Sequence, residues 1–214
     1  MIKILPYTTK EPLQMIGYCA GICWNSDVSD SGKNIDRALD CINSGHTRTA
    51  EFPDVYCIID GYSARCIREL YTHIVGTTRL QESTRYVNCD GFDYYDPTKG
   101  NDRQTLVYNQ TMTTIRQAYK ELIEAGMSRE DAANILPLGM STKIVWKINL
   151  RALIHFMNER LCKRAYKEIR ALSNELKSAL IDYSTEWSQI AYAYFYPKCV
   201  GSHCKEKHPC KQII

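Results

Sequence analysis

The sequence predicts an α+β fold, and three observations support this prediction. The chain has 214 residues, of which 44% are hydrophobic, so it is long enough to bury one sizeable core. Segments typical of strands and of helices follow one another without a regular strand–helix–strand alternation, which disfavours a doubly wound parallel sheet. The chain also contains no internal repeat and no glycine-rich phosphate-binding loop.

The first half of the chain is expected to form two strands and three helices. Residues 54–60 (DVYCIID) are rich in β-branched and aromatic side chains, which is typical of a buried strand. Asn34 is expected to cap a helix that ends near Ser44, where Gly45 can adopt the positive φ of a helix C-terminus. The expected elements are a strand over 1–8, a helix over 12–20, a polar loop over 25–33, a helix over 34–44, a strand over 54–60 and a helix over 64–73.

The second half is expected to be mainly helical. Ser128 opens the capping signature Ser-Arg-Glu-Asp, and Asn149 is the expected cap of a strongly amphipathic helix. The apolar stripe of that helix is formed by Leu150, Leu153, Ile154, Met157 and Leu161. The expected elements are a loop from Gly76, an extended segment over 83–88, turns over 89–102, helices over 103–125 and 128–134, a strand over 138–146, and helices over 149–162 and 164–191.

Charge and hydropathy exclude several classes of function. The net charge of +3 is modest and its lysines and arginines are dispersed, so a nucleic-acid-binding surface is not expected. No apolar run approaches the roughly 18 residues that a membrane span requires. The first ten residues are too short and polar for a signal peptide. We therefore expect a cytoplasmic protein with neither membrane nor nucleic acid as partner.

Ser83 and Arg85 form the first candidate site. In an extended chain, residues i and i+2 point to the same side, so the Ser83 hydroxyl and the Arg85 guanidinium would converge and could grip one phosphate. Because Ser-x-Arg is a common tripeptide, a solvated strand is the alternative interpretation.

Asn149, Arg151 and His155 form the second candidate site. Arg151 and His155 are one helical turn apart and share a face that is not the apolar stripe. The alternative is an ordinary solvated helix face with Asn149 as its cap. Arg160 follows Arg151 by nine residues, which places it about half a turn out of phase, so one straight helix would not direct both into one pocket.

Three segments together resemble a known family. Residues 136–170 read LPLGMSTKIVWKINLRALIHFMNERLCKRAYKEIR, which is similar to the C-terminal core of flavin-dependent thymidylate synthases, the thymidylate synthase complementing proteins. The matching positions there are Leu136, Pro137, Leu138, Thr142, Asn149, Arg151, Leu153, Phe156, Arg160, Ala165, Glu168, Ile169 and Arg170. Gly45-His46 followed by Glu51 resembles the flavin-contacting motif of the family, and residues 83–86 (STRY) match the Ser-x-Arg-Tyr that closes its signature. The resemblance extends over residues 20–170.

The resemblance implies a fold and an activity. The fold would be a mixed, mainly antiparallel sheet flanked by long helices. The activity would be conversion of dUMP to dTMP, with methylenetetrahydrofolate as carbon donor and with FAD, reduced by NADPH, as reductant. The family also implies a homotetramer with active sites between subunits. No protein nucleophile is needed, so Ser83 is expected to contact the ligand, and no obvious base lies beside it in the sequence.

The resemblance assigns roles by position. The residues implied for dUMP are Ser83, Arg85, Gln81, Glu82 and Arg160, and of these Ser83 and Arg160 are the implied catalytic residues. The residues implied for the flavin or folate are His46, Glu51, His73, Arg79, Asn149, Arg151 and His155.

The chain also departs from the family pattern. The usual Arg-His-Arg triplet reads Thr72-His73-Ile74, or His73-Ile74-Val75 in the other register, so both arginines are lost. A further family arginine falls on Ala133, and Arg79 or the pair Arg65 and Arg68 could compensate. These changes indicate a divergent branch. They leave open a related enzyme that methylates or hydroxymethylates another pyrimidine nucleotide, and a non-catalytic nucleotide-binding homologue.

The last residues form a tail rich in Cys and His, so we expect a catalytic domain over 1–195 and a tail over 196–214. The tail holds Cys199, His203, Cys204, His208 and Cys210. These are zinc-ligating residue types, but the spacings Cys-x4-Cys and Cys-x5-Cys are not a standard pair. We therefore assign no metal site, and the alternatives are a small zinc clip or free thiols.

Overall fold

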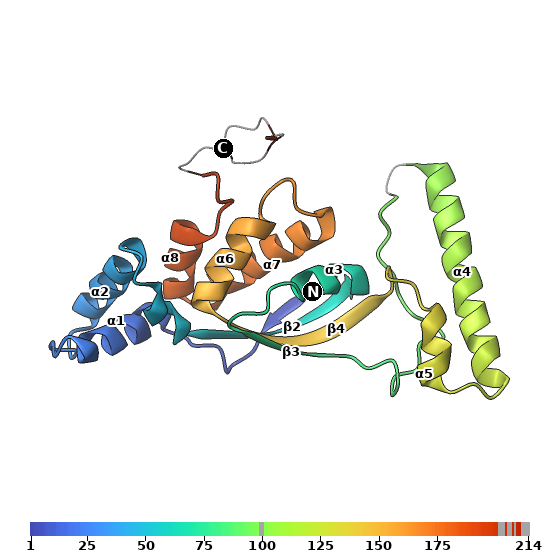
Figure 1. Ribbon diagram of the computed structural model, residues 1–214, viewed down its shortest axis with the longest axis horizontal. Coiled ribbons are helices and arrows are strands. Elements are labelled where there is room, and N and C mark those ends of the chain that lie inside the picture. Colours follow the sequence, from blue (N-terminus) through green and yellow to red (C-terminus); the bar gives the residue numbers. More distant parts are fainter. Residues whose placement is uncertain (99–100, 201–203, 205–206, 208, 211–214) are drawn as a thin grey trace.

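A computed structural model describes residues 1–98, 101–200, 204, 207, 209 and 210. At its centre is a four-stranded sheet with the strand order β1-β2-β4-β3, in which every neighbouring pair is antiparallel (Figure 1). The strands are β1 (Ile2–Ile4), β2 (Asp54–Ser63), β3 (Thr77–Gln81) and β4 (Ser141–Asn149). The expected α+β class and antiparallel sheet are confirmed.

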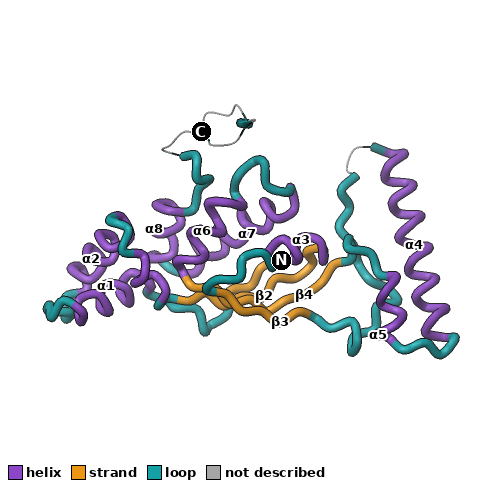
Figure 2. Tube along the Cα trace, viewed as in Figure 1, coloured by secondary structure: helices purple, strands orange, loops and turns teal. Residues whose placement is uncertain are grey.

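Helices cover one face and both ends of this sheet. The α-helices are α1 (Pro12–Cys23), α2 (Ser31–Asn43), α3 (Ala64–Leu70), α4 (Asp102–Glu124), α5 (Arg129–Ala132), α6 (Leu150–Arg160), α7 (Lys167–Tyr183) and α8 (Thr185–Tyr194). Two short 3-10 helices are η1 (Thr47–Glu51) and η2 (Ala133–Ile135). Figure 2 shows α3, α6, α7 and α8 on one side of the strands, the α1–α2 hairpin at one end and α4 with α5 at the other.

The main core lies between the sheet and helices α3, α6, α7 and α8. Alternate residues of β2 and β4 are fully buried, and they pack with the apolar stripes of α6 and α7. This alternation is the expected consequence of side chains that point to opposite faces of a strand. The inward strand residues are Val55, Cys57, Ile59, Ile144, Trp146 and Ile148.

The long helix α4 belongs to a second, smaller core at one end of the molecule. It packs mainly against α5 and η2, and its buried side chains Met112 and Tyr119 meet Phe92 and Met140 from the flanking segments. In Figure 1 this arm projects away from the helices that cover the sheet. Among the described residues, no buried side chain belongs to both cores.

Several sequence-based boundaries are wrong. The helix expected from Asn34 begins at Ser31, because Asp30 is its cap: the Asp30 carboxylate accepts the backbone N–H of Lys33. The helix expected over 164–191 is two helices, separated by Ser184 in an extended conformation. The loop expected after Gly76 contains β3, and the strand expected over 138–146 lies three residues later.

The N-terminal strand is shorter than expected, and only part of the tail is described. The strand expected over 1–8 is reduced to Ile2–Ile4, paired with β2. In the tail, Cys204 and Cys210 are exposed, whereas His203 and His208 lie outside the described residues. Within the described part of the chain no helix is long and apolar enough to cross a membrane, and no group of three or more potential metal ligands occurs.

Candidate functional site

A hollow of about 560 Å³ lies where η1, the segment after α3 and the start of α6 meet. Its walls come from three parts of the chain that are far apart in sequence. It is lined by Glu51, Thr72, His73, Ile74, Val75, Gly76, Asn149, Arg151, Ala152 and His155. Five residues expected to contact a flavin or folate therefore line one pocket, namely Glu51, His73, Asn149, Arg151 and His155.

Asn149 and Gly76 form the base of this pocket. The Asn149 side-chain oxygen accepts the backbone N–H of Ala152, so Asn149 caps α6 as expected. Its own backbone N–H donates to the Gly76 carbonyl over 2.9 Å. Gly76 has a φ of +70°, and a Cβ there would lie 2.5 Å from the Asn149 amide nitrogen. Only glycine fits this close approach and this backbone conformation.

Arg151 and Glu51 form an ion pair at the pocket wall. The Arg151 Nη1 lies 2.5 Å from Glu51 Oε1, and this contact joins the first turn of α6 to the end of η1. Both side chains are about half exposed. The pair orients the guanidinium and leaves its other N–H groups able to donate to a ligand.

His73 is held by aromatic and cationic neighbours. Its ring meets the Phe156 ring edge-on at 5.0 Å and lies 5.9 Å from the His155 ring. Burial, reinforced by the charges of Arg160 and His155, lowers the pKa of His73 to about 4. His73 is therefore neutral at physiological pH.

Arg160 lies behind the pocket rather than in its lining. Its Nε–H donates to His73 Nε2 over 2.9 Å, and Nη2 donates to the Thr72 hydroxyl over 2.9 Å. The opposite phases of Arg151 and Arg160 on α6 thus place one guanidinium at the pocket wall and the other against the back of His73.

The expected extended segment over 83–88 is wrong. The backbone N–H groups of Tyr86 and Val87 both donate to the Ser83 carbonyl, so the chain turns. The Arg85 side chain pairs with Glu130 at 3.1 Å, and only the backbone N–H of Arg85 reaches the Ser83 hydroxyl. The i, i+2 argument for a shared phosphate grip therefore fails for this conformation, because a turn does not alternate its side chains as a strand does.

The remaining candidates lie along β3 and before η1. Gln81 accepts from the Tyr71 hydroxyl and donates to Thr142, while Glu82 is exposed. Arg79 stacks on Tyr71 with its guanidinium carbon 3.8 Å from the ring centre. Neither Arg79 nor His46 belongs to the pocket lining, and His46 is exposed just before η1.

Sequence reasoning missed several lining residues. Ile74 and Val75 are 70% and 81% exposed and form an apolar lip at the positions where the family pattern has its second arginine. The sequence placed the start of a loop at Gly76, which adopts a positive φ between α3 and β3, but the two β-branched residues just before it were not recognised as part of a site.

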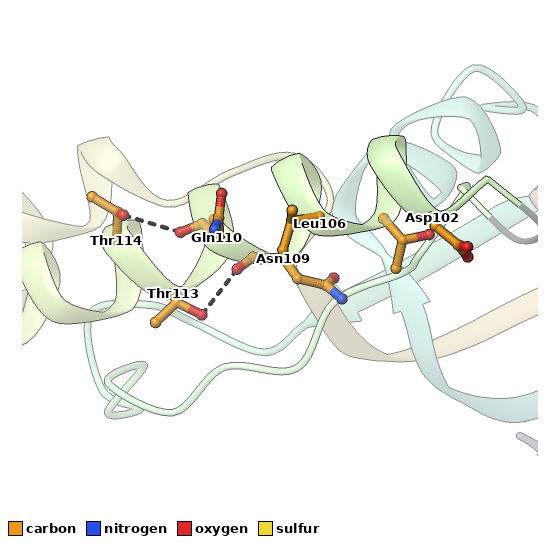
Figure 3. A pocket seen from close by; sticks show the side chains of 7 residues that line it. Asp102, Leu106, Asn109, Gln110, Thr113 and Thr114 are labelled. Atoms are coloured by element: carbon orange, nitrogen blue, oxygen red, sulfur yellow. Dashed lines mark hydrogen bonds between the residues drawn. The ribbon is translucent and has the colours of Figure 1, made fainter.

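A second hollow runs along the N-terminal half of α4 (Figure 3). The labelled threonines Thr113 and Thr114 donate their hydroxyls back to the carbonyls of Asn109 and Gln110. The hollow is formed by a single helix, and none of the residues expected to carry chemistry lines it. We therefore place the candidate site at the first pocket.

Comparison with known proteins identifies the family. The model of the thymidylate synthase complementing protein family matches residues 3–182. A flavin-dependent thymidylate synthase of Geobacter sulfurreducens is 32% identical over 179 residues, covering 78% of this chain and 77% of that protein. One of Clostridium tetani is 28% identical over 238 residues, covering 96% of this chain and 90% of that protein.

Solved structures agree on the fold. A UMP/dUMP methylase, PolB, from Streptomyces cacaoi bound with 5-Br dUMP has a TM-score of 0.74 at 18% identity, over 91% of this chain and 95% of that one. The flavin-dependent thymidylate synthase ThyX from Helicobacter pylori, complexed with FAD and dUMP, has a TM-score of 0.70 at 20% identity, over 90% of this chain and 97% of that one. With the family match over most of its length, the chain belongs to the thymidylate synthase complementing proteins, the family of flavin-dependent thymidylate synthases.

Proposed function

We propose that this protein converts dUMP to dTMP, using FAD as cofactor, methylenetetrahydrofolate as carbon donor and NADPH as the source of electrons. The observation that carries the proposal is the pocket itself. Three parts of the chain that are far apart in sequence supply Glu51, then His73, and then Asn149, Arg151 and His155. All five line one hollow, and the family pattern relates all five to the flavin or folate.

The chemistry of the lining fits a flavin. Ile74, Val75 and Ala152 supply an apolar surface, while Asn149 and Arg151 supply N–H donors. An apolar wall with a few fixed polar groups suits a flat heteroaromatic ring that carries carbonyl oxygens and ring nitrogens along its edge. The neutral His73 adds a polar group without adding charge.

The flavin, when bound, supplies the reducing equivalent for one-carbon transfer to the pyrimidine. The protein's own residues bind and orient. Glu51 holds Arg151, and the first turn of α6 holds Asn149. Both side chains would direct their N–H groups at the edge of the ring. Arginine charge near the pyrimidine would stabilise negative charge that develops on a carbonyl oxygen. The residues proposed for dUMP remain Ser83, Arg85, Gln81, Glu82 and Arg160.

The separation of Ser83 and Arg85 from the pocket supports an assembly with shared sites. The pocket lies at the Gly76 end of β3, and Ser83 and Arg85 follow its other end. The five residues of β3 extend roughly 17 Å. We therefore infer that the nucleotide-binding turn of one subunit serves the flavin pocket of another, in the homotetramer that the family implies.

A second candidate function is methylation or hydroxymethylation of a different pyrimidine nucleotide. Two observations favour keeping it. One similar structure is a UMP/dUMP methylase, and Ile74 and Val75 stand where the family pattern has an arginine. Product analysis by mass after incubation with dUMP, UMP and dCMP distinguishes the two candidates.

The first test is the visible absorption spectrum of the purified protein. We expect a flavin band, retained or acquired on adding FAD, which bleaches under NADPH without oxygen and bleaches faster when dUMP is present. Arg151→Gln should weaken FAD binding about tenfold, because one charge-assisted hydrogen bond is lost. Arg48→Gln, an exposed arginine on η1 outside the lining, is the matched control. A protein that acquires no flavin at any FAD concentration contradicts the proposal.

A further inference from the structure

Arg160 is fixed in place although it does not line the pocket. Its side chain is only 19% exposed, and it pairs with Glu69 Oε2 at 3.4 Å. Its Nε–H donates to His73 Nε2, and Nη2 donates to the Thr72 hydroxyl, each over 2.9 Å. These contacts join the end of α6 to the end of α3 and to the segment that follows it.

The contact with His73 determines which nitrogen of the imidazole carries the proton. An arginine stays protonated in proteins, and its N–H groups can only donate. The Nε2 atom that receives the Arg160 hydrogen bond must therefore offer a lone pair. In a neutral imidazole the single proton is then on Nδ1.

The surroundings keep the ring neutral and in place. The groups that face it are Arg160, His155 and Glu159 on α6, with Glu69 on α3 reaching Arg160 from the other side. Burial, followed by the charge of Arg160 and the proximity of His155, lowers the pKa of His73, and Glu159 acts in the opposite direction. The backbone is anchored as well, because the His73 N–H donates to Leu70 and its carbonyl accepts from the Thr77 hydroxyl.

We propose that Arg160 is a positioning residue that holds His73 in the Nδ1–H tautomer, so that His73 presents one hydrogen-bond donor to the pocket's ligand. His73 lines the pocket, and no acceptor for its Nδ1 is found among the described residues. The ligand atom that it would meet is an acceptor, a carbonyl oxygen or an unprotonated ring nitrogen. This inference rests on the proposed flavin site. It adds to the nucleotide contact proposed for Arg160, whose guanidinium has five N–H groups.

The tautomer can be measured without any ligand, by nitrogen–proton correlation NMR of the protein with 15N-labelled histidine. The chain has five histidines, and the His73 signals are identified by their loss in His73→Asn. We expect the Nδ1–H pattern and no protonation of the ring above about pH 5. A ring that carries its proton on Nε2, or that protonates near pH 6.5, overturns the proposal even if flavin binds.

Two variants near the end of α6 distinguish a specific effect of Arg160 on the His73 tautomer from a general effect of nearby positive charge. Arg160→Gln should give a mixture of tautomers and raise the pKa of His73 by about one unit, because the donor and its charge are removed. Lys163→Gln removes an exposed positive charge nearby and should change neither. If Arg160→Gln folds and leaves the Nδ1–H pattern unchanged, Arg160 does not set the tautomer. If it does not fold, the tautomer of the unmodified protein still decides.

Binding of FAD and riboflavin, followed by flavin fluorescence, tests the donor itself. The amide nitrogen of Asn lies near the position of Nδ1 and that of Gln near Nε2, so His73→Asn should bind both flavins better than His73→Gln, by about tenfold. The reverse order contradicts a donor at Nδ1. If neither the unmodified protein nor any variant binds a flavin, the proposed function fails, whereas the tautomer result stands on its own.

Discussion

Single residues define the pocket through contacts that leave little freedom. Asn149 ends β4 and caps α6, and it also contacts the segment after α3 through Gly76. Outside the pocket lining, Glu168 is fixed in a similar way: it is buried, and it accepts from the Ser63 N–H, the Ser63 hydroxyl and the Tyr166 hydroxyl. These hydrogen bonds satisfy the carboxyl oxygens where water is excluded, and they tie the start of α7 to the end of β2.

Replacing Gly76 by alanine should damage both stability and the pocket. The new Cβ would require a positive φ and would lie 2.5 Å from Asn149, so we expect a loss of about 2–3 kcal/mol in the free energy of unfolding and weaker flavin binding. Urea denaturation measures the first effect and flavin fluorescence the second. Gly91→Ala, where a Cβ meets nothing within 4 Å, should be nearly neutral. Equal losses for the two variants would contradict the close approach.

His73 should contribute to the pH dependence of stability. Its pKa of about 4 in the folded protein lies below its ordinary value of 6.5, so the unfolded chain binds more protons between these values. The contribution of His73 to the free energy of unfolding is therefore complete above about pH 6.5, and it is lost as the pH falls towards 4. Because the ring is partly exposed, solvent screening limits the loss to about 1–2 kcal/mol. Urea titrations at several pH values should give a shallower dependence on pH for His73→Asn than for the unmodified protein, and an equal dependence would contradict the lowered pKa of His73.

Elements begin and end where side chains satisfy their free backbone groups. The cap of α2 is Asp30, one turn before Asn34, the cap that the sequence predicted. Asn34 is instead buried against α1. There its carbonyl occupies the space that a Cβ on Gly17 would need, so the two helices touch backbone to backbone. Ser184 separates α7 from α8 in the same manner: its hydroxyl accepts the Trp187 N–H and donates to the Lys10 carbonyl.

Removal of the Asp30 cap should destabilise the α1–α2 hairpin. We expect Asp30→Ala to lower the free energy of unfolding by about 1 kcal/mol, since the Lys33 N–H loses its acceptor. Asp36→Ala, an exposed residue inside the same helix, serves as the control and should change stability by less than half as much. Thermal unfolding followed by circular dichroism compares them. A larger effect at Asp36 would mean that the cap is elsewhere.

The molecule as a whole consists of a sheet-centred body and the α4–α5 arm, each with its own core. Separate cores allow separate unfolding, because cooperativity depends on shared buried contacts. The arm buries few large side chains around Met112 and Tyr119, whereas the body buries the full inward face of β2 and β4.

Hydrogen exchange should therefore reveal the arm as the less stable unit. We expect α4 amides to exchange faster than those of β4 and α6 under native conditions. Met112→Ala should increase exchange in α4 and α5 and leave β4 unchanged. Met157→Ala, a truncation of the same kind in the main core, should increase exchange in the body as well. Uniform changes across the chain in both variants would show that the two cores unfold as one.

The sequence by itself determined the elements whose signals are local. The apolar period and the Asn149 cap predict α6, the Ser128 signature predicts the start of α5, and the apolar run of residues 54–60 predicts most of β2. Each depends on neighbours within a turn or two of the chain, so the pattern of adjacent residues is sufficient. The family motifs also indicated five of the pocket residues, although not that they would meet.

Only the tertiary structure decided the rest. The segment Thr77–Gln81 has no alternating pattern and becomes β3 because β4 offers a partner edge. The turn at Ser83 and the break at Ser184 depend on contacts with residues far along the chain, as does the hydrogen bond between Arg160 and His73, which are 87 residues apart. Such pairs leave no mark in local periodicity, because burial and hydrogen bonding act between whatever groups the fold brings together.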